Sequence, residues 1–227
     1  MARRSVTLAQ LRAEILDQAD MTGSDFITTA RLDNWINKEL SELYDLIVSA
    51  FSDHFVLTTE LTTVSGQEWV LMPDDVYKII QVFYKDSSGS RWKLKKFMAG
   101  EIHRLSDDFR SVYDAPKCSM YRWIGNKMYF LPEPTEAGTI ELWYIPHLTE
   151  LVNDTDSISL QIPVGWEDYV VCGVASRCLI KEESDPTPLL ARKAAITQRI
   201  EDMAANRDEG EPDRVVDSRD HDDWDLW

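Results

Sequence analysis

The sequence predicts an α+β protein: an α-helical bundle built from N-terminal and C-terminal helices, an antiparallel β-rich lobe inserted between them, and an extended C-terminal tail. Three observations predict this class. Apolar residues recur every three or four positions before residue 52 and again between residues 163 and 206. From residue 54 to residue 146 the pattern changes to short β-rich runs bounded by turn residues. Beyond residue 206 the chain is acidic and has no apolar period.

These changes of pattern divide the chain into four segments. We expect the N-terminal helices of the bundle in residues 1–53 and the β-rich lobe in 54–150. The C-terminal helices of the bundle should occupy 151–206, and the acidic extended tail should occupy 207–227. With 227 residues, the chain is long enough to bury a core of its own.

The N-terminal segment contains two helical patterns. In residues 6–20 one face is apolar, and Thr7 is a candidate N-cap. That face consists of Leu8, Leu11, Ile15 and Ala19. A longer helix is expected from Thr29 to Phe51, and its stripe is wide enough for burial on more than one side. The stripe consists of Leu32, Ile36, Leu40, Leu43, Ile47 and Phe51, broadened by Trp35, Tyr44 and Val48.

The β-rich segment should form three hairpins and one further strand, roughly six or seven strands in all. The run HFVLTTELTTV is separated from EWVLMP by SGQ, and VYKIIQVFYKD is separated from SRWKLKKF by SSG. The third hairpin lies in residues 120–131, and GTIELWYIP adds the last strand. Residues 97–105 have the pattern of a short helix.

The third hairpin has a definite register, because Gly125 and Asn126 form a two-residue turn signal. The expected pairs are Ile124 with Lys127, Trp123 with Met128, Arg122 with Tyr129, and Tyr121 with Phe130. One face then holds Tyr121, Trp123, Met128 and Phe130, and the other holds Arg122, Lys127 and Tyr129. Since the cations lie opposite the larger aromatic side chains, the hairpin favours a packed sheet over a platform for nucleic-acid bases.

Helical spacing returns in residues 163–182 and 186–206, separated by the breaker SDP. Pro163 would lie near the first turn of the earlier helix. In that helix Gly173, Ala175 and Ser176 are small enough to let another helix approach closely.

The charge of the chain argues against general affinity for nucleic acid. The formal net charge is −16 and the pI is about 4.6. Residues 201–227 hold 11 acidic and 3 basic residues, so this segment carries half of the net negative charge of the chain.

No signal peptide or membrane-spanning run is recognisable, and the three cysteines form no CxxC pair. We therefore expect a protein made in a cytosol, without a membrane partner.

No pattern of catalytic residues is present, so we expect no enzyme and no cofactor. GxSxG, GxxxxGK[ST] and GxGxxG motifs are absent, and the four histidines are scattered. The run DHDD at 220–223 could hold a metal weakly, but a solvated acidic tail explains it better, so we expect no metal site. In RWKLKKF a strand would place Arg91, Lys93 and Lys95 on one face. That face could touch phosphate, or it could be a solvated surface that discourages edge pairing.

The end of the tail is unusual, because Trp224, Leu226 and Trp227 follow an acidic stretch. Exposed tryptophans are unfavourable for solubility and are enriched at binding hot spots. We expect an intermolecular anchor, and the alternative is a tail that folds back on its own domain. The composition predicts that residues 207–227 are disordered alone, and the apolar side chains at the end predict that the tail becomes ordered on a partner.

Four stretches of the sequence resemble the phage head-to-tail adaptor proteins. They are RLDNWINKELSELYDLI before a strand pair, LMPDDVYKIIQVFY, IGNKMYFLPEPTEAGTIELWYIP and IPVGWEDYVVCGVASRCLIKEE. The resemblance covers about residues 8–206 and lies in the order of the motifs more than in any one of them. The very acidic terminus with aromatic residues at its end departs from the family's pattern.

The resemblance implies a structural virion protein that forms a ring, usually of twelve copies, beneath the portal. Its partners would be the portal protein, further copies of itself, and tail or nozzle proteins at the head–tail interface. DNA would pass through the lumen without specific binding. The resemblance implies that the C-terminal segment reaches the portal. Together with the tail's own composition, this makes Asp220, Asp222, Asp223, Trp224, Leu226 and Trp227 the residues that we expect to bind the portal. The residues alone leave two alternatives: a soluble enzyme with an unrecognised site, or a module that binds basic partners through its acidic tail.

Overall fold

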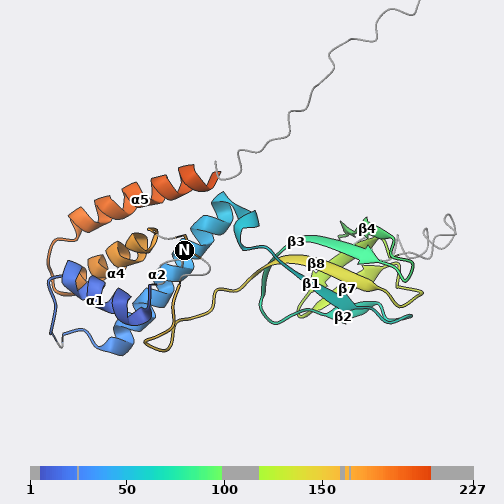
Figure 1. The fold of residues 1–227 in the computed structure, drawn as a ribbon, viewed down its shortest axis with the longest axis horizontal. Helices are drawn as coiled ribbons and strands as arrows, with labels where there is room; N and C mark the ends of the chain where they lie inside the picture. The colour runs from blue at the N-terminus through green and yellow to red at the C-terminus, as the bar shows by residue number, and fades with distance from the viewer. Residues whose placement is uncertain (1–5, 25, 99–117, 159–161, 164, 206–227) are drawn as a thin grey trace, which may run out of the picture.

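The protein is elongated, with its helices at one end and its strands at the other (Figure 1). The computed structural model describes residues 6–24, 26–98, 118–158, 162–163 and 165–205. In this part of the chain four α-helices and two four-stranded sheets confirm the α+β class. No helix in the described residues is both long enough and apolar enough to cross a membrane.

The first two helices begin and end close to where the apolar spacing predicts. Helix α1 spans Leu8–Gln18, and Thr7 caps it by accepting from the backbone of Gln10, whose side chain accepts from Thr7 in return. Helix α2 spans Thr29–Ala50, and the short 3-10 helix η1, Ser52–Phe55, follows it directly. The predicted face of α1 and most of the predicted α2 stripe are buried in one core, although Phe51 is only partly buried.

The C-terminal helices are α4, Glu167–Lys181, and α5, Thr187–Ala205. Helix α4 begins after the position that Pro163 suggested. The Trp166 amide donates to the Pro163 carbonyl, and Gly165 has a φ of +95°. A residue with this φ cannot be part of a right-handed α-helix, so the helix begins beyond Gly165. Helix α4 is buried between its neighbours, and side chains from all four helices share one apolar core.

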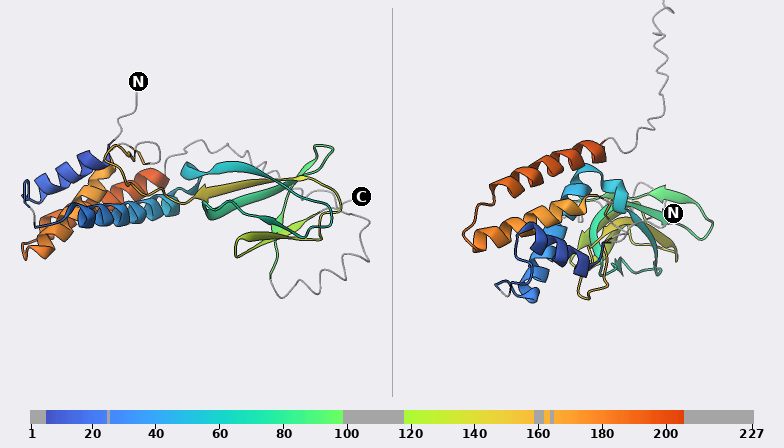
Figure 2. Two further views of the ribbon diagram at one scale, coloured as in Figure 1. Left: turned by 90° about the horizontal axis from the view of Figure 1, so that it is seen from below. Right: turned by 60° about the vertical axis from the view of Figure 1, so that its left-hand side comes forward.

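The strands form two sheets that enclose a second apolar core (Figure 2). The first sheet has the order β1–β8–β3–β4, and the second has the order β2–β7–β6–β5. The bounds in the first sheet are β1 Leu57–Thr62, β8 Thr139–Pro146, β3 Val76–Lys85 and β4 Arg91–Lys93. The bounds in the second sheet are β2 Trp69–Leu71, β7 Lys127–Leu131, β6 Met120–Ile124 and β5 Lys95–Lys96.

Two of the three predicted hairpins are confirmed. Strands β3 and β4 pair antiparallel, and strands β6 and β7 pair in the predicted register, with Trp123 opposite Met128 and Tyr121 opposite Phe130. Met128 and Phe130 belong to the core and Tyr121 packs against it. Trp123 is 37% exposed at the end of this hairpin.

The hairpin expected across SGQ is wrong. Strand β1 pairs with β8, while β2 pairs with β7 in the other sheet. The connection crosses between the sheets and is held to a distant segment, since the amide of Gly66 donates to the carbonyl of Pro134. A Gly-containing break between two β-rich runs therefore marks a sheet-to-sheet crossing here, and not a turn within one sheet.

The strand expected over RWKLKKF is also wrong. It is divided at Leu94, which is buried in the β core, so β4 belongs to one sheet and β5 to the other. Arg91 therefore does not share a sheet with Lys95. Its guanidinium lies 3.9 Å from the centre of the Phe83 ring and forms an ion pair with Glu141 at 2.8 Å. The helix expected in residues 97–105 falls mainly outside the described residues.

Candidate functional site

The residues expected to anchor the protein to a partner all lie outside the described part of the chain. They are Asp220, Asp222, Asp223, Trp224, Leu226 and Trp227. The DHDD run is therefore outside it as well. In the residues that the structure does describe, no group of three or more His, Cys, Asp or Glu side chains could hold a metal ion.

The three cysteines have the properties of core residues. All three are reduced and buried. Burial raises the pKa of the Cys118 thiol to about 12 and that of the Cys178 thiol to about 11. Burial also raises the pKa of Cys172. Since the thiolate is the reactive form, these side chains are poor nucleophiles at neutral pH.

A cluster of aromatic side chains joins the helices to the sheets. The Tyr44 hydroxyl on α2 donates to the carbonyl of Pro146, at the end of β8, at 2.6 Å. The Tyr77 hydroxyl on β3 donates to Asp45 of α2 at 2.7 Å. The ring of Tyr77 packs edge-on against both Tyr44 and His147. Two hydrogen bonds and the edge-on ring contacts therefore join the helices to the sheets.

Burial raises the pKa of Tyr44 to about 12, and the nearby Tyr77 and Asp45 contribute. The hydroxyl consequently remains protonated at neutral pH and can donate its hydrogen bond to the Pro146 carbonyl.

Residues 147–158, which we call the strap, lead from β8 back along the helices. Asn37 of α2 binds both backbone groups of Leu151, donating to its carbonyl at 3.0 Å and accepting from its amide at 2.9 Å. The Asp154 carboxylate accepts from Arg12 of α1. The backbone carbonyls of Asp154 and Asp156 accept from the first free amides of α1, those of Ala9 and Leu8.

The Asp156 carboxylate holds the strap in a tight turn. It accepts from the amides of Asn153 and Val152 at 2.8 and 2.9 Å, which lowers its pKa. By accepting from both amides, this carboxylate stabilises the turn.

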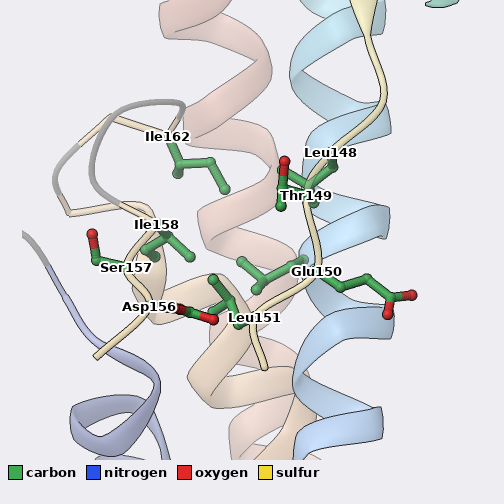
Figure 3. A pocket seen from close by; sticks show the side chains of 9 residues that line it. Leu148, Thr149, Glu150, Leu151, Asp156, Ser157, Ile158 and Ile162 are labelled. Carbon is green, nitrogen blue, oxygen red and sulfur yellow. The ribbon is translucent and has the colours of Figure 1, made fainter. Parts of the chain in front are cut away.

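A cavity of about 300 Å³ lies between the strap and α2 (Figure 3). Four aliphatic side chains, those of Leu148, Leu151, Ile158 and Ile162, point toward its middle, while Glu150 extends away from it. In the described residues no buried side-chain polar atom lacks a hydrogen-bond partner. Aliphatic side chains therefore form much of the lining, and Thr149, Asp156 and Ser157 supply its polar part.

A buried ion cluster joins three helices. Glu39 of α2 is 1% exposed, and its carboxylate lies 2.6 Å from Arg177 of α4 and 2.6 Å from Lys193 of α5. Both cations also reach Glu42, one turn further along α2. Burial lowers the pKa of Lys193, but the hydrogen bond and charge of Glu39 outweigh it, so that the pKa lies above its ordinary value of 10.5.

Gly173 makes this cluster possible. A side chain at this position of α4 would overlap the Glu39 carboxylate, so the expected close approach of a helix at Gly173 is confirmed. The sequence analysis missed Glu39 itself. Its signal is an acidic residue three positions after Ile36 and next to Leu40, on the face that the apolar stripe predicts to be buried.

These features are connections between elements, and they stabilise the fold in the described residues. A protein-family model described as SU10 adaptor protein matches residues 6–219, nearly the whole chain. No curated protein matches the chain.

Proposed function

The chain belongs to the SU10 adaptor protein family, a family of phage head-to-tail adaptors, and on this premise we propose that it forms a ring beneath the portal. As an adaptor it is a structural component of the virion that contacts other head and tail components. The proposed ring has twelve copies, as is usual in the family, and it joins the capsid vertex to the tail.

The family match over residues 6–219 is the observation that carries this proposal. The organisation of the molecule supports it. Tyr44 and Tyr77 hold the helices and the sheets in one orientation, so each copy can transmit a load from one partner to the next. The described residues offer ion pairs and apolar contacts that stabilise this shape, which suits a structural role.

We assign a role to each of the four segments defined above. Residues 1–53 and 151–206 form the helical body, 54–150 form the β-rich lobe that meets tail or nozzle proteins, and 207–227 form the tail. In the proposed assembly the tail reaches the portal, where Trp224, Leu226 and Trp227 fill pockets and Asp220, Asp222 and Asp223 favour a basic groove. In this proposal the protein is made in the host cytoplasm and is located in the neck of the virion.

DNA passes through the lumen of the proposed ring without specific binding. The net charge of −16 per chain is multiplied around the ring, and a surface of this sign repels phosphate at long range. Repulsion lets DNA slide, whereas a basic lumen would retain it by releasing counterions.

The decisive experiment mixes the purified protein with its portal and counts the bound copies by native mass spectrometry and electron microscopy. The proposal expects a closed ring of about twelve copies on each portal. A single bound copy, or no binding, would contradict it. The same images show whether the β-rich lobe points away from the portal, as the assignment of this lobe to the tail side requires.

A further inference from the structure

The sheet β1–β8–β3–β4 has two open edges, which lie on opposite sides of the β-rich lobe. Within the described residues, no strand pairs with the outer edge of β1 or of β4. Strand β1 is the longer of the two, and its six residues pair with β8 without a break in register. It contains no proline and no bulge, and Glu60 is its one charged residue. Because edge strands usually carry such features to prevent pairing, β1 is suited to accept a further strand.

The backbone of β1 directs every second residue toward its open edge. The Thr63 amide donates to the Gly138 carbonyl at 2.9 Å, and this pair continues the register of β1 with β8. In an antiparallel ladder, hydrogen-bonded pairs alternate with pairs that are not hydrogen-bonded. Counting back from Thr63, the residues of β1 whose amides and carbonyls face away from β8 are Thr58, Glu60 and Thr62.

The same alternation determines which backbone groups of β4 face its open edge. The Leu94 amide donates to the Val82 carbonyl at 2.9 Å, so this pair is hydrogen-bonded between β4 and β3. It shares the register in which Lys93 lies opposite Phe83. Pairs one residue away from it are not hydrogen-bonded, and the same holds two residues further along. The amides and carbonyls of Arg91 and Lys93 therefore face away from β3.

The outward-facing residues of the two edges lie in shared rows across the sheet. Successive pairings through β8 and β3 connect Glu60 of β1 to Lys93 of β4. They connect Thr62 to Arg91 in the same way. Because β8 and β3 run along the long axis of the molecule, the residues of one row lie at one height along this axis (Figures 1 and 2). The two edges therefore present open backbone groups at the same heights on opposite sides of the lobe.

The side chains in one of these rows have opposite charges. Leu61 and Trp92 pack against the β core, so their neighbours Glu60 and Lys93 point to the outer side of the sheet. The Glu60 side chain is 61% exposed, and its ion pair with Lys85 of the same chain is long, at 3.9 Å. Lys93 is also exposed. One edge of the sheet therefore offers an acid, and the other edge offers a base on the same face and at the same height.

We propose that β1 of one copy pairs with β4 of the next copy, so that the sheets of neighbouring lobes join into one sheet. The copies of a closed ring are related by rotation about the ring axis, without translation along it. When the long axis of each copy follows the ring axis, this rotation preserves the direction and the height of every strand. Strands β1 and β4 run in opposite directions, so the new pairing is antiparallel. The inference rests on the proposed ring and names a contact that forms it.

Rotation without translation also determines the register of the contact. Residues of one row have equal height, so Glu60 meets Lys93 of the next copy and Thr62 meets Arg91 of the next copy. All four face the open edges, so each pair can exchange two backbone hydrogen bonds. A shift by one residue would place Glu60 and Lys93 on opposite faces, and it is therefore excluded. Since β4 has only three residues, one contact should be weak until a portal holds the copies side by side.

Charge exchange tests the pairing of Glu60 with Lys93 in the full chain. Glu60→Lys and Lys93→Glu should each raise the protein concentration needed for complete rings on the portal about fivefold, because like charges then meet in one pair. Native mass spectrometry measures this concentration. The chain with both substitutions has the net charge of the parent and again places opposite charges in the pair, so it should assemble as the parent does. Failure of the double variant to recover would contradict the proposed pairing.

Proline substitution separates loss of the contact from loss of folding. Proline has no amide hydrogen, and edge strands tolerate it where the amide faces solvent. Thr62→Pro removes an outward-facing amide, so it should leave the melting temperature nearly unchanged and weaken ring assembly about tenfold or more. Thr59→Pro is the matched control: it removes an amide that faces β8, and it should lower the melting temperature by several degrees. Normal ring assembly by a folded Thr62→Pro chain would overturn the proposal.

Cross-linking identifies the neighbouring strands directly. Because the three native thiols are buried, introduced cysteines are the reactive ones. Within one chain Glu60 and Lys93 are three strand spacings apart, about 14 Å, so cysteines at these positions can form disulfides only between chains. Glu60→Cys with Lys93→Cys should give a ladder of linked oligomers on mild oxidation. Glu60→Cys with Lys127→Cys, which moves the second thiol to β7 of the other sheet, should not. Equal results from the two variants would contradict the contact.

Further outcomes distinguish this inference from the proposed function. If the Thr62→Pro chain forms complete rings on the portal, the strands named here are wrong and the ring stands. If the Glu60→Cys, Lys93→Cys chain forms its ladder at high concentration without portal, but only one parent copy binds each portal, the contact stands and the ring is wrong. A dimer of the free protein that Thr62→Pro dissociates and Lys93→Glu does not affect would show that β1 pairs with β1 of a second copy, and the proposal would fail.

Discussion

The carboxylate of Glu39 on α2 accepts a hydrogen bond from Lys193 on α5 at 2.6 Å, in a position almost closed to solvent. The two residues lie far apart in the sequence, and their contact joins the N-terminal and C-terminal helices. Arg177 of α4 completes the pairing from the other side. The stability of the helical body should therefore depend on one acidic residue.

We predict that Glu39→Gln lowers the free energy of unfolding by about 3 kcal/mol, because it leaves two cations facing a neutral amide in a buried site. Urea denaturation monitored by circular dichroism measures the change. Glu42→Gln is the matched control: Glu42 binds the same cations but its side chain is 50% exposed, so its loss should cost under about 1 kcal/mol. Equal effects of the two substitutions would contradict the buried position of Glu39.

We predict that stability falls as the pH rises above 10. The pKa of Tyr44 is raised to about 12 by burial, and that of Lys193 is also raised. A raised folded-state pKa contributes stability that is complete below the unfolded value and is lost as the pH rises through the folded value. The loss for Tyr44 should therefore occur between about pH 10 and pH 12. Melting temperatures across this pH range measure the loss when they are compared with those of the Tyr44→Phe variant. If the melting temperatures of the parent chain and the variant fall in parallel, Tyr44 does not contribute to the loss.

Tyr44→Phe should cost about 1 kcal/mol at neutral pH, since it removes the hydrogen bond to the Pro146 carbonyl and keeps the ring. The more specific effect is on the relative orientation of helices and sheets. Small-angle scattering should give a broader pair-distance distribution for the Tyr44→Phe variant than for the parent chain. Tyr129→Phe, a change on the outer side of a sheet, is a suitable control and should leave the scattering profile unchanged.

Trp224→Ala with Trp227→Ala should weaken binding to the portal tenfold or more, because burial of such side chains contributes on the order of 2 kcal/mol each. The melting temperature of the helices and sheets should not change. Neutralising Asp220, Asp222 and Asp223 should mainly slow association and reduce its dependence on salt. Normal portal binding by the double tryptophan variant, or a lower melting temperature, would show that the tail packs on its own chain.

We predict negligible affinity for duplex DNA at about 150 mM salt. Nonspecific DNA-binding proteins have dissociation constants of roughly 10⁻⁴ to 10⁻⁶ M near this salt concentration, so gel-shift titration into the micromolar range is sufficient. The net charge of −16 opposes binding. A shift at micromolar protein that disappears in the Lys95→Glu, Lys96→Glu variant would contradict this prediction and assign DNA binding to the lysines of β5.

Local patterns in the sequence determined most of the elements. The spacing of Leu8, Leu11 and Ile15 predicted α1 and its buried face, and Thr7 predicted where it begins. Gly125 with Asn126 predicted the pairing of β6 with β7 residue by residue, because a two-residue turn allows only one register. The family resemblance likewise depended on the order of short motifs, and the family match over residues 6–219 confirms it.

Only the tertiary structure decided which elements meet. Periodicity reports that a face is buried, but not what buries it, so the sequence did not distinguish a hairpin from the crossing between β1 and β2. The same limit applies to RWKLKKF, where burial of Leu94 divides one apparent strand between two sheets. It applies most strongly to Glu39, whose partners Arg177 and Lys193 come from helices more than a hundred residues away. Long-range contacts of this kind depend on the fold as a whole, and no local spacing of residues encodes them.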